Sequence, residues 1–234
     1  MPLLRLICCV LALAPTLFVS GCSTTSIIGQ IETPPELSTK ILPIRTLKVL
    51  VAYDDPSDLD GIRKVLDEAS TILKKQIGVE LETLPAPVVV TWGKRGYNPM
   101  LGHLELVTKH REPKFDIAIG FARRSNTDLH CIDGSWAAVI ENGYRRFIVS
   151  QELHPWFIAH EVAHAFVFSH THSPEGLLKA SASLILPGVY ALAVDDYRLT
   201  AEDLDEALRN KWRKFGERVT VVSDGPVPEK CAKQ

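Results

Sequence analysis

The stretch His154–Pro174 reads HPWFIAHEVAHAFVFSHTHSP and holds five of the eight histidines of the chain. Its apolar residues predict a helix, and Pro155 suits the first helical position because a proline there loses no helical hydrogen bond. His160 and His164 are four residues apart, about 40° from each other around such a helix, so both rings can reach one metal ion. Glu161 would lie beside that ion, where a carboxylate can accept a proton from metal-bound water. The spacing HExxH therefore predicts a metal site with a general base.

The third ligand is less easily placed. A catalytic zinc ion takes three protein ligands and keeps one position open for water. If the helix simply continued, His170 would lie about 240° around from His164 and His172 about 80° around, so neither would converge on the ion. The chain must therefore leave the helix after His164 if either histidine is the third ligand.

The segment His160–His170, HEVAHAFVFSH, resembles the zinc motif of the metzincins, HExxHxxGxxH, with all three histidines and the glutamate in place. The resemblance implies that His160, His164 and His170 bind Zn²⁺ and that the catalytic Glu161 assists attack of zinc-bound water on a peptide bond. His172 is the second choice for the third ligand. Val167 occupies the position of the family's glycine, where a β-branched residue would be strained in a left-handed turn. We therefore expect the turn to be built differently, for example at Ser169.

Further stretches support the same resemblance. Residues 171–180, THSPEGLLKA, are similar to the segment that follows the zinc ligands in matrixins, and Leu178 stands where that family has a methionine. Leu178 or Leu186 would then support the turn in its place. The resemblance implies a divergent metzincin-like zinc metallopeptidase of α/β (α+β) class. Its expected parts are a twisted mixed sheet with an antiparallel edge hairpin, a zinc-binding helix and a C-terminal helix.

The hydrophobic pattern gives the same order of elements. An apolar run at 47–53 predicts a strand, and apolar residues at helical spacing from Ser57 to Gly78 predict an amphipathic helix. Strands are expected within 79–92 and at 115–122, with a short helix between them at 99–109. Residues 134–141 and 144–150 predict a hairpin, because the dipeptide Asn142-Gly143 favours a type I′ turn. Thr200 is expected to cap the last helix.

The N-terminus predicts export and lipidation. Arg5 precedes the apolar run Leu6–Val19, and the small residues Ser20 and Gly21 precede Cys22. This pattern is typical of a secretory signal, and VSGC resembles the bacterial lipobox, in which the cysteine becomes the acylated first residue. We therefore expect a lipoprotein of the bacterial cell envelope, anchored in a membrane through Cys22. Ser23 favours the outer membrane, with the domain on its periplasmic face.

The expected organisation is a signal peptide at 1–21, a Ser/Thr/Pro-rich tether at 22–45, a catalytic domain at 46–222 and a tail at 223–234. Cys8 and Cys9 leave with the signal, so Cys131 and Cys231 remain in an oxidising compartment. We expect them to form a disulfide that ties the tail to the domain. Two unpaired thiols are the alternative.

The composition and charge of the chain indicate which classes of molecule it binds. The chain has 234 residues, 46% of them hydrophobic, and a formal charge of −2, which suits one globular domain. Its basic residues are scattered and slightly outnumbered by acids, which argues against a nucleic-acid binder. We expect a monomer that takes a protein or peptide substrate. Such a substrate would add a strand to the edge of the sheet along residues 134–141.

Two other readings keep part of this pattern. A gluzincin-like peptidase would use HExxH with an acid from a later helix, Glu202 or Glu206, and would need no turn at Val167. A non-catalytic envelope lipoprotein would use the zinc ion only to stabilise its fold. Glu161 separates the second reading from an enzyme, since a structural zinc site closes its fourth position with a protein ligand and needs no general base.

Overall fold

The computed structural model of the chain describes residues 43–93, 96–111, 114–122, 137–179, 184–186, 189–190 and 197–222, with backbone alone at 184–186 and 189–190. All of them belong to one unit, Ile31–Gln234. The signal peptide, Cys22, the Cys131–Cys231 pair and the C-terminal tail lie outside these residues, so those predictions stay open. Within the described part, no helix is long and apolar enough to cross a bilayer.

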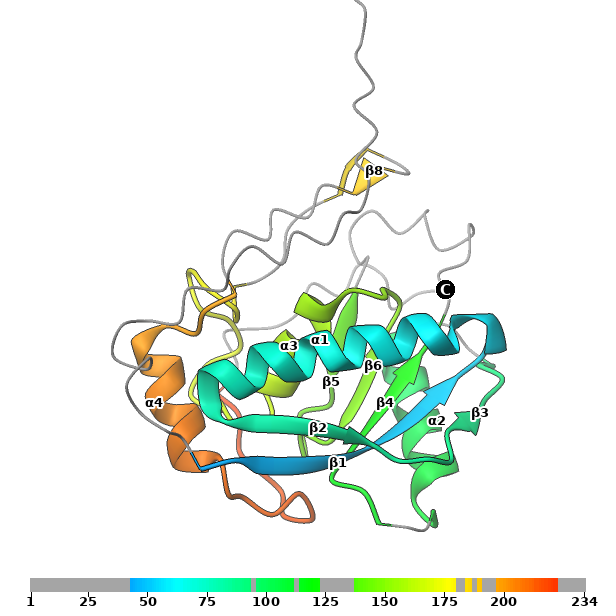
Figure 1. The fold of residues 1–234 in the computed structure, drawn as a ribbon, viewed down its shortest axis with the longest axis horizontal. Helices are drawn as coiled ribbons and strands as arrows, with labels where there is room; N and C mark the ends of the chain where they lie inside the picture. The colour runs from blue at the N-terminus through cyan, green and yellow to red at the C-terminus, as the bar shows by residue number, and fades with distance from the viewer. Residues whose placement is uncertain are drawn as a thin grey trace, which may run out of the picture. The chain divides into compact units, whose positions relative to one another are not determined.

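A six-stranded mixed sheet forms the centre of the fold (Figure 1). Its main path runs β2-β1-β4-β6-β5, and β3 pairs with the end of β1. All neighbours are parallel except β5, which is antiparallel to β6 and lies at the edge. The strands are β1 (Arg45–Tyr53), β2 (Val79–Thr83), β3 (Val88–Val89), β4 (Ile117–Phe121), β5 (Ala138–Ile140) and β6 (Phe147–Ser150). A separate antiparallel pair joins β7 (Leu184–Leu186) to β8 (Val189–Tyr190).

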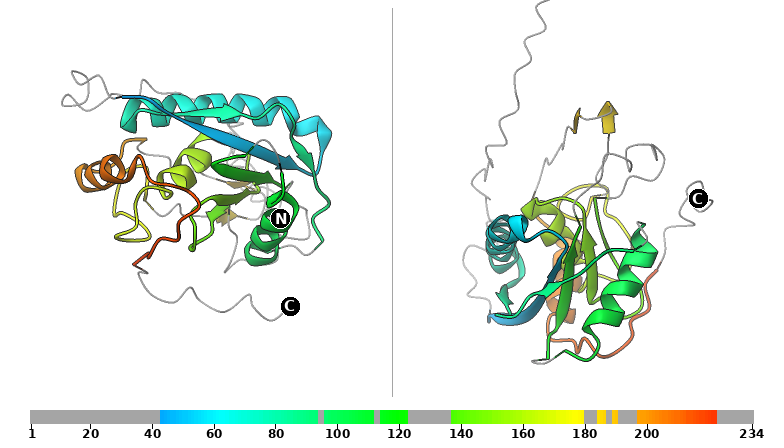
Figure 2. Two further views of the ribbon diagram at one scale, coloured as in Figure 1. Left: turned by 90° about the horizontal axis from the view of Figure 1, so that it is seen from below. Right: turned by 90° about the vertical axis from the view of Figure 1, so that its right-hand side faces the viewer.

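Four α-helices and one short 3-10 helix accompany the sheet. They are η1 (Pro56–Asp58), α1 (Leu59–Ile77), α2 (Tyr97–Thr108), α3 (Pro155–Ala163) and α4 (Ala201–Asn210). Buried side chains of α1 and α3 pack on one face of the sheet, and those of α2 pack on the other. Figure 2 shows α1 and α2 on opposite sides of the strands. The fold class expected from the sequence is therefore confirmed, including the edge hairpin and the two C-terminal helices.

Strand β1 is central because it can be buried on both faces. Val49, Leu50, Val51 and Ala52 are each at most 3% exposed. Unbroken apolar runs of this kind are typical of parallel strands covered by helices on both sides. Helix α1 then ends as expected at Gly78, whose φ of 66° is the left-handed conformation that glycine adopts at little cost.

The hairpin between β5 and β6 differs from the expected type I′ turn. Among the described residues, the non-glycine position with positive φ is Arg145, at 51°, and neither Asn142 nor Gly143 has one. The reason is the carboxylate of Glu141, which accepts hydrogen bonds from the backbone N–H groups of Gly143, Tyr144 and Arg146. The connection between β5 and β6 is therefore a longer loop that surrounds the Glu141 carboxylate, and this loop places Arg145 in the core.

Gly176 fixes the loop that follows α3. Its φ is 76°, and an added Cβ would lie 2.5 Å from the backbone oxygen of Arg198. We expect Gly176→Ala to lower the free energy of unfolding by about 2 kcal/mol or more, because left-handed strain and a backbone clash add together. Gly102→Ala is the matched control, since a Cβ there meets nothing within 4 Å and α2 gains roughly 0.5–1 kcal/mol. Urea denaturation measures both, and equal stabilities of the two variants would contradict the expectation.

Candidate metal centre

Helix α3 carries the HExxH residues and is buried along its whole length, Pro155–Ala163. It begins where the sequence indicates. The His154 side chain accepts a hydrogen bond from the N–H of Trp156 at 3.2 Å, and Pro155 takes the first position. This cap fixes the register of the helix, which in turn decides which side chains face the metal centre.

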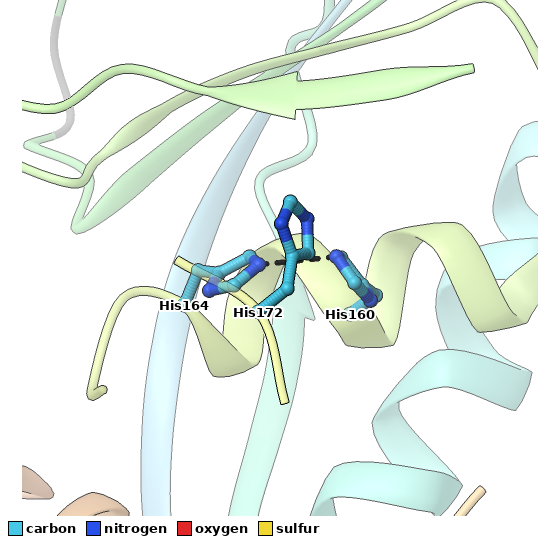
Figure 3. Close-up of side chains that lie close together, drawn as sticks. All are labelled: His160, His164 and His172. Carbon is cyan, nitrogen blue, oxygen red and sulfur yellow. Dashed lines mark hydrogen bonds between the residues drawn. The ribbon is translucent and has the colours of Figure 1, made fainter. Parts of the chain in front are cut away.

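His160 and His164 point toward each other from successive turns of the helix end (Figure 3). Their Nε2 atoms are 3.0 Å apart and their ring centroids 4.6 Å apart. His160 is 4% exposed and His164 is 3% exposed. The helical spacing therefore produces the predicted convergence of two buried imidazole nitrogens.

A backbone carbonyl orients His160. Its Nδ1 lies 2.7 Å from the oxygen of Leu177, so Nδ1–H donates and the lone pair stays on Nε2. The Trp156 ring, 4.8 Å away between centroids, packs against the imidazole. Leu177 is itself fixed, since its N–H donates to the oxygen of Arg198 at 2.6 Å. A histidine whose outer nitrogen is held by a carbonyl is typical of metal ligands, because that bond sets the tautomer.

His164 has no such partner among the described residues. Its buried Nδ1 makes no hydrogen bond there, and its Nε2 faces the lone pair of His160 Nε2. If His164 carries its proton on Nε2, it donates that proton to His160 and leaves the lone pair on its own Nδ1 without a partner among the described residues; if it carries the proton on Nδ1, two lone pairs face each other at 3.0 Å. In the second tautomer a metal ion between the two Nε2 atoms removes the repulsion, so the pair can serve as two metal ligands.

His172 completes the cluster. One ligand atom each of His160, His164 and His172 lies within 4.8 Å of the others. The His172 ring centroid is 5.6 Å from that of His160 and 5.5 Å from that of His164. His172 is exposed whereas the other two are buried. Three imidazoles, two of them buried and one exposed to solvent, match the donor set of a catalytic Zn²⁺ site.

The protonation of the buried pair suits metal binding. Burial lowers the pKa of His160 to about 3 and that of His164 well below its usual value, and nearby His172 and Arg145 lower both further. Both rings are therefore neutral near pH 7. Neutral imidazole is the form that coordinates Zn²⁺, so no proton has to be displaced from these two rings.

The structure brings His172, and not His170, to this cluster, which differs from the expectation drawn from the metzincin motif. The reason lies in the turn. The helix ends with the tight bonds Ala165 N–H to Val162 O and Phe166 N–H to Ala163 O. Val167 then enters the core without a positive φ. The eight-residue spacing from His164 to His172 is two residues longer than the motif's six, so the chain returns to the metal centre without a left-handed residue.

His170 is instead directed toward α4. Its Nε2 lies 2.8 Å from the Asp203 carboxylate and 2.8 Å from the Ser173 hydroxyl oxygen. Glu206 binds the backbone of the same loop, and Glu202 is exposed. Neither glutamate joins the metal-binding group found among the described residues. Leu178 is fully buried in the core, as expected for a residue that supports this turn.

Glu161 is buried at 6% exposure, on the helical turn that carries His160. Burial raises the pKa of its carboxyl group to about 8, against the opposing effects of Arg145 and of the backbone N–H of Ile140. A carboxyl group whose pKa lies near neutral can both accept and return a proton. Ile140 belongs to the edge strand β5, so the carboxyl lies where a strand added to the sheet would pass.

Arg145 is a feature that the sequence did not reveal. It is 1% exposed, and its Nε and one terminal nitrogen have no hydrogen-bond partner among the described residues. Burial lowers its pKa, while Glu161 and Glu141 raise it. The local sequence does not predict that Arg145 is buried, because its burial follows from the hairpin loop around Glu141.

Comparison with known proteins gives distant structural matches. No model of a protein family and no curated protein sequence matches the chain. The fold is similar to that of archaemetzincin from Methanopyrus kandleri, with a TM-score of 0.49 and 14% identity over 72% of this chain and 97% of that one. A zinc-dependent peptidase from Methanocorpusculum labreanum (strain Z) gives a TM-score of 0.32 and 10% identity over 68% and 92% of the two chains.

The buried carboxyl makes a prediction for the zinc-free protein. The pKa of Glu161 is about 8 when folded and near the ordinary value of 4.5 when unfolded, so the native state alone keeps the proton between these pH values. Stability from this group is full below pH 4.5 and is lost as the pH rises through 8. Relative to wild type, Glu161→Gln should gain up to about 1.4 kcal/mol of unfolding free energy per pH unit across that window.

Urea denaturation in the presence of a chelator, repeated from pH 5 to pH 8, measures this difference. The lowered pKa values of His160 and His164 affect both proteins and cancel in the comparison. Parallel stability curves for wild type and Glu161→Gln would show that the carboxyl group is not held protonated.

Proposed function

We propose that the chain is a zinc-dependent endopeptidase in which His160, His164 and His172 hold the metal ion and Glu161 is the general base. The observation that carries this proposal is the convergence of three imidazole nitrogens within 4.8 Å of one another at the end of α3. Two of these rings are buried and neutral, and the third faces solvent. Bound there, Zn²⁺ would act as a Lewis acid that activates water and polarises a carbonyl group.

Glu161 supplies the proton transfer. Its carboxyl group is one residue along the helix from His160, within the same buried environment, and Arg145 favours its charged form. A carboxylate at this place can take a proton from the attacking water and return it to the leaving amine. Because the group is buried, few water molecules compete for that proton.

The sheet edge supports a peptide substrate. Strand β5 is the last strand on the path of the sheet, and Glu141 N–H donates to Phe147 O in its pairing with β6. In an antiparallel pair the next residue inward, Ile140, then directs its N–H and C=O away from β6, and its N–H bonds to the Glu161 carboxyl group on that side. A substrate strand paired at this edge would pass the carboxyl group of Glu161. This arrangement favours cleavage within an extended chain.

Envelope anchoring is a separate part of the proposal and rests on the sequence. Cys22 follows a lipobox-like VSG, and residues 22–45 are rich in Ser, Thr and Pro. An acylated Cys22 would hold the domain at the periplasmic face of a bacterial membrane on a flexible tether. A Cys131–Cys231 disulfide would suit that oxidising compartment.

The ligand assignment is tested by metal content and proteolysis together. We expect wild type to bind one zinc ion per chain and to cleave casein or an envelope protein. His172→Ala should lose zinc, because two imidazoles alone hold it weakly. Glu161→Gln should keep zinc and lose about 100- to 10,000-fold in turnover, since only the proton transfer is removed.

The exposed His110 provides the control, since His110→Ala should change neither zinc content nor turnover. Metal analysis by mass spectrometry and a fluorescent casein assay are the measurements. Zinc-loaded wild type that cleaves no member of the substrate panel would favour a structural zinc site. Loss of zinc in Glu202→Ala would favour the gluzincin-like arrangement.

Anchoring is tested by changing the lipidated residue. We expect wild type expressed in a Gram-negative host to take up labelled palmitate and to sediment with membranes, because acyl chains on Cys22 partition into the bilayer. Cys22→Ala should lose the label and leave the membrane fraction after cleavage of the signal. Cys9→Ala, within the apolar run, is the control that should behave as wild type. Labelling that persists in Cys22→Ala would rule out this lipobox.

A further inference from the structure

The segment Phe168–Ser173, which carries His172, is attached to α4 at both of its ends. At the first end, the Glu206 carboxylate accepts hydrogen bonds from the N–H groups of Phe168 at 2.6 Å and Ser169 at 3.1 Å. At the second end, the Ser173 hydroxyl donates to Asp203 at 2.6 Å. The third histidine of the metal centre is thus held between two carboxylates that lie on one helix.

His170 lies between these attachments. Its Nδ1 is 2.8 Å from the Ser169 hydroxyl oxygen, and its Nε2 is 2.8 Å from both the Ser173 hydroxyl oxygen and Asp203 Oδ1. Each serine hydroxyl has one hydrogen, which Ser169 donates to Glu206 and Ser173 donates to Asp203. Both nitrogens of His170 are therefore engaged by these two hydroxyl oxygens, and His170 is not among the histidines that converge on the metal centre.

Asp203 is fully buried in the first turn of α4. Its interaction with the helix dipole does not explain this burial, because an exposed acid such as the adjacent Glu202 interacts with the dipole equally well. A buried carboxylate is costly unless it is hydrogen-bonded or paired. Its Oδ2 accepts a hydrogen bond from the Ser173 hydroxyl, and its Oδ1, which has no hydrogen-bond donor among the described residues, lies 2.8 Å from Nε2 of His170. Both of these residues belong to the segment that carries His172.

Ser173 also connects this attachment to the other side of the metal centre. It is 7% exposed, and its N–H donates to the oxygen of Leu178 at 2.9 Å. The neighbouring carbonyl, that of Leu177, accepts from Nδ1 of His160. One short path of hydrogen bonds thus joins Asp203 to the backbone that orients His160, with His172 next to Ser173 in the chain.

We propose that Asp203, His170 and Ser173 form a latch that positions His172 as the third metal ligand, with His170 a positioning residue and not a ligand. This inference rests on the proposed zinc site. Changes to residues that orient metal ligands typically weaken metal affinity about 10- to 100-fold. Loss of the latch should therefore weaken zinc binding without abolishing it, whereas loss of His172 removes a ligand outright.

Zinc affinity, measured by competition with a chromophoric chelator, is the test. His170→Ala and Asp203→Asn should each weaken zinc binding about 10- to 100-fold, and His172→Ala should weaken it more. His170→Gln should recover part of the loss, because its amide can still donate to the Ser173 hydroxyl oxygen. Glu202→Gln is the matched control in the same helical turn and should bind zinc as wild type does.

Two further measurements separate positioning from simple destabilisation. The visible spectrum of Co²⁺-substituted protein reports ligand geometry, and it should change in His170→Ala at full occupancy while Glu202→Gln keeps the wild-type spectrum. Urea denaturation of the zinc-free variants shows whether each one folds. If Asp203→Asn is unfolded, His170→Ala still gives the answer, because this side chain is 25% exposed and lies at the surface of the latch.

The outcomes distinguish the latch from the zinc site itself. Wild-type zinc affinity in folded His170→Ala and Asp203→Asn would overturn the latch and leave the zinc site intact. Complete loss of zinc in His170→Ala with retention in His172→Ala would also overturn it, since His170 would then be the ligand. Failure of wild type to bind zinc at all would overturn the proposed function.

Discussion

The metal centre depends on two buried imidazole nitrogens that face each other at 3.0 Å. Because the Nδ1–H of His160 donates to the carbonyl of Leu177, the lone pair of His160 lies on Nε2 and faces His164. With its own proton on Nδ1, His164 presents a second lone pair at the same place, and the two nitrogens can bind one cation. The surrounding structure imposes this geometry through α3, which fixes the spacing of the rings, and through Gly176, which fixes the path of the Leu177 backbone.

The length of the loop after α3 decides which later histidine can lie beside the Nε2 atoms of His160 and His164. A six-residue spacing requires a sharp turn, which a left-handed glycine makes cheaply and a valine does not. With eight residues between His164 and His172, the chain can close the helix with tight turns and bury Val167 instead. The departure from the motif at Val167 is thus accompanied by a longer path to His172, the histidine that joins the cluster.

Helix α4 has a part in the metal centre although it contributes no ligand. Asp203 and Glu206 accept hydrogen bonds from Ser173 and Ser169, and the hydroxyl oxygens of these two serines engage both nitrogens of His170. On the opposite side, the hairpin around Glu141 buries Arg145 near Glu161, which favours the charged form of that carboxyl against its burial. Three charged residues outside the HExxH motif, Asp203, Glu206 and Arg145, thus shape the surroundings of the motif residues.

The sequence by itself determined the order of elements, both ends of α1, the starts of α3 and α4, the edge hairpin, and the pairing of His160 with His164. These follow from local signals: hydrophobic period, a proline and caps at helix starts, Gly78 at a helix end, and a four-residue spacing. The tertiary structure alone decided the third histidine, the turn at Arg145 and the burial of Asp203. The third histidine and the burial of Asp203 depend on groups more than a helical turn apart in the chain, where loop length and side-chain hydrogen bonds outweigh local preference. The turn at Arg145 depends on a nearer group, the Glu141 carboxylate, whose hydrogen bonds to the backbone outweigh the preference of Asn142-Gly143 for a type I′ turn.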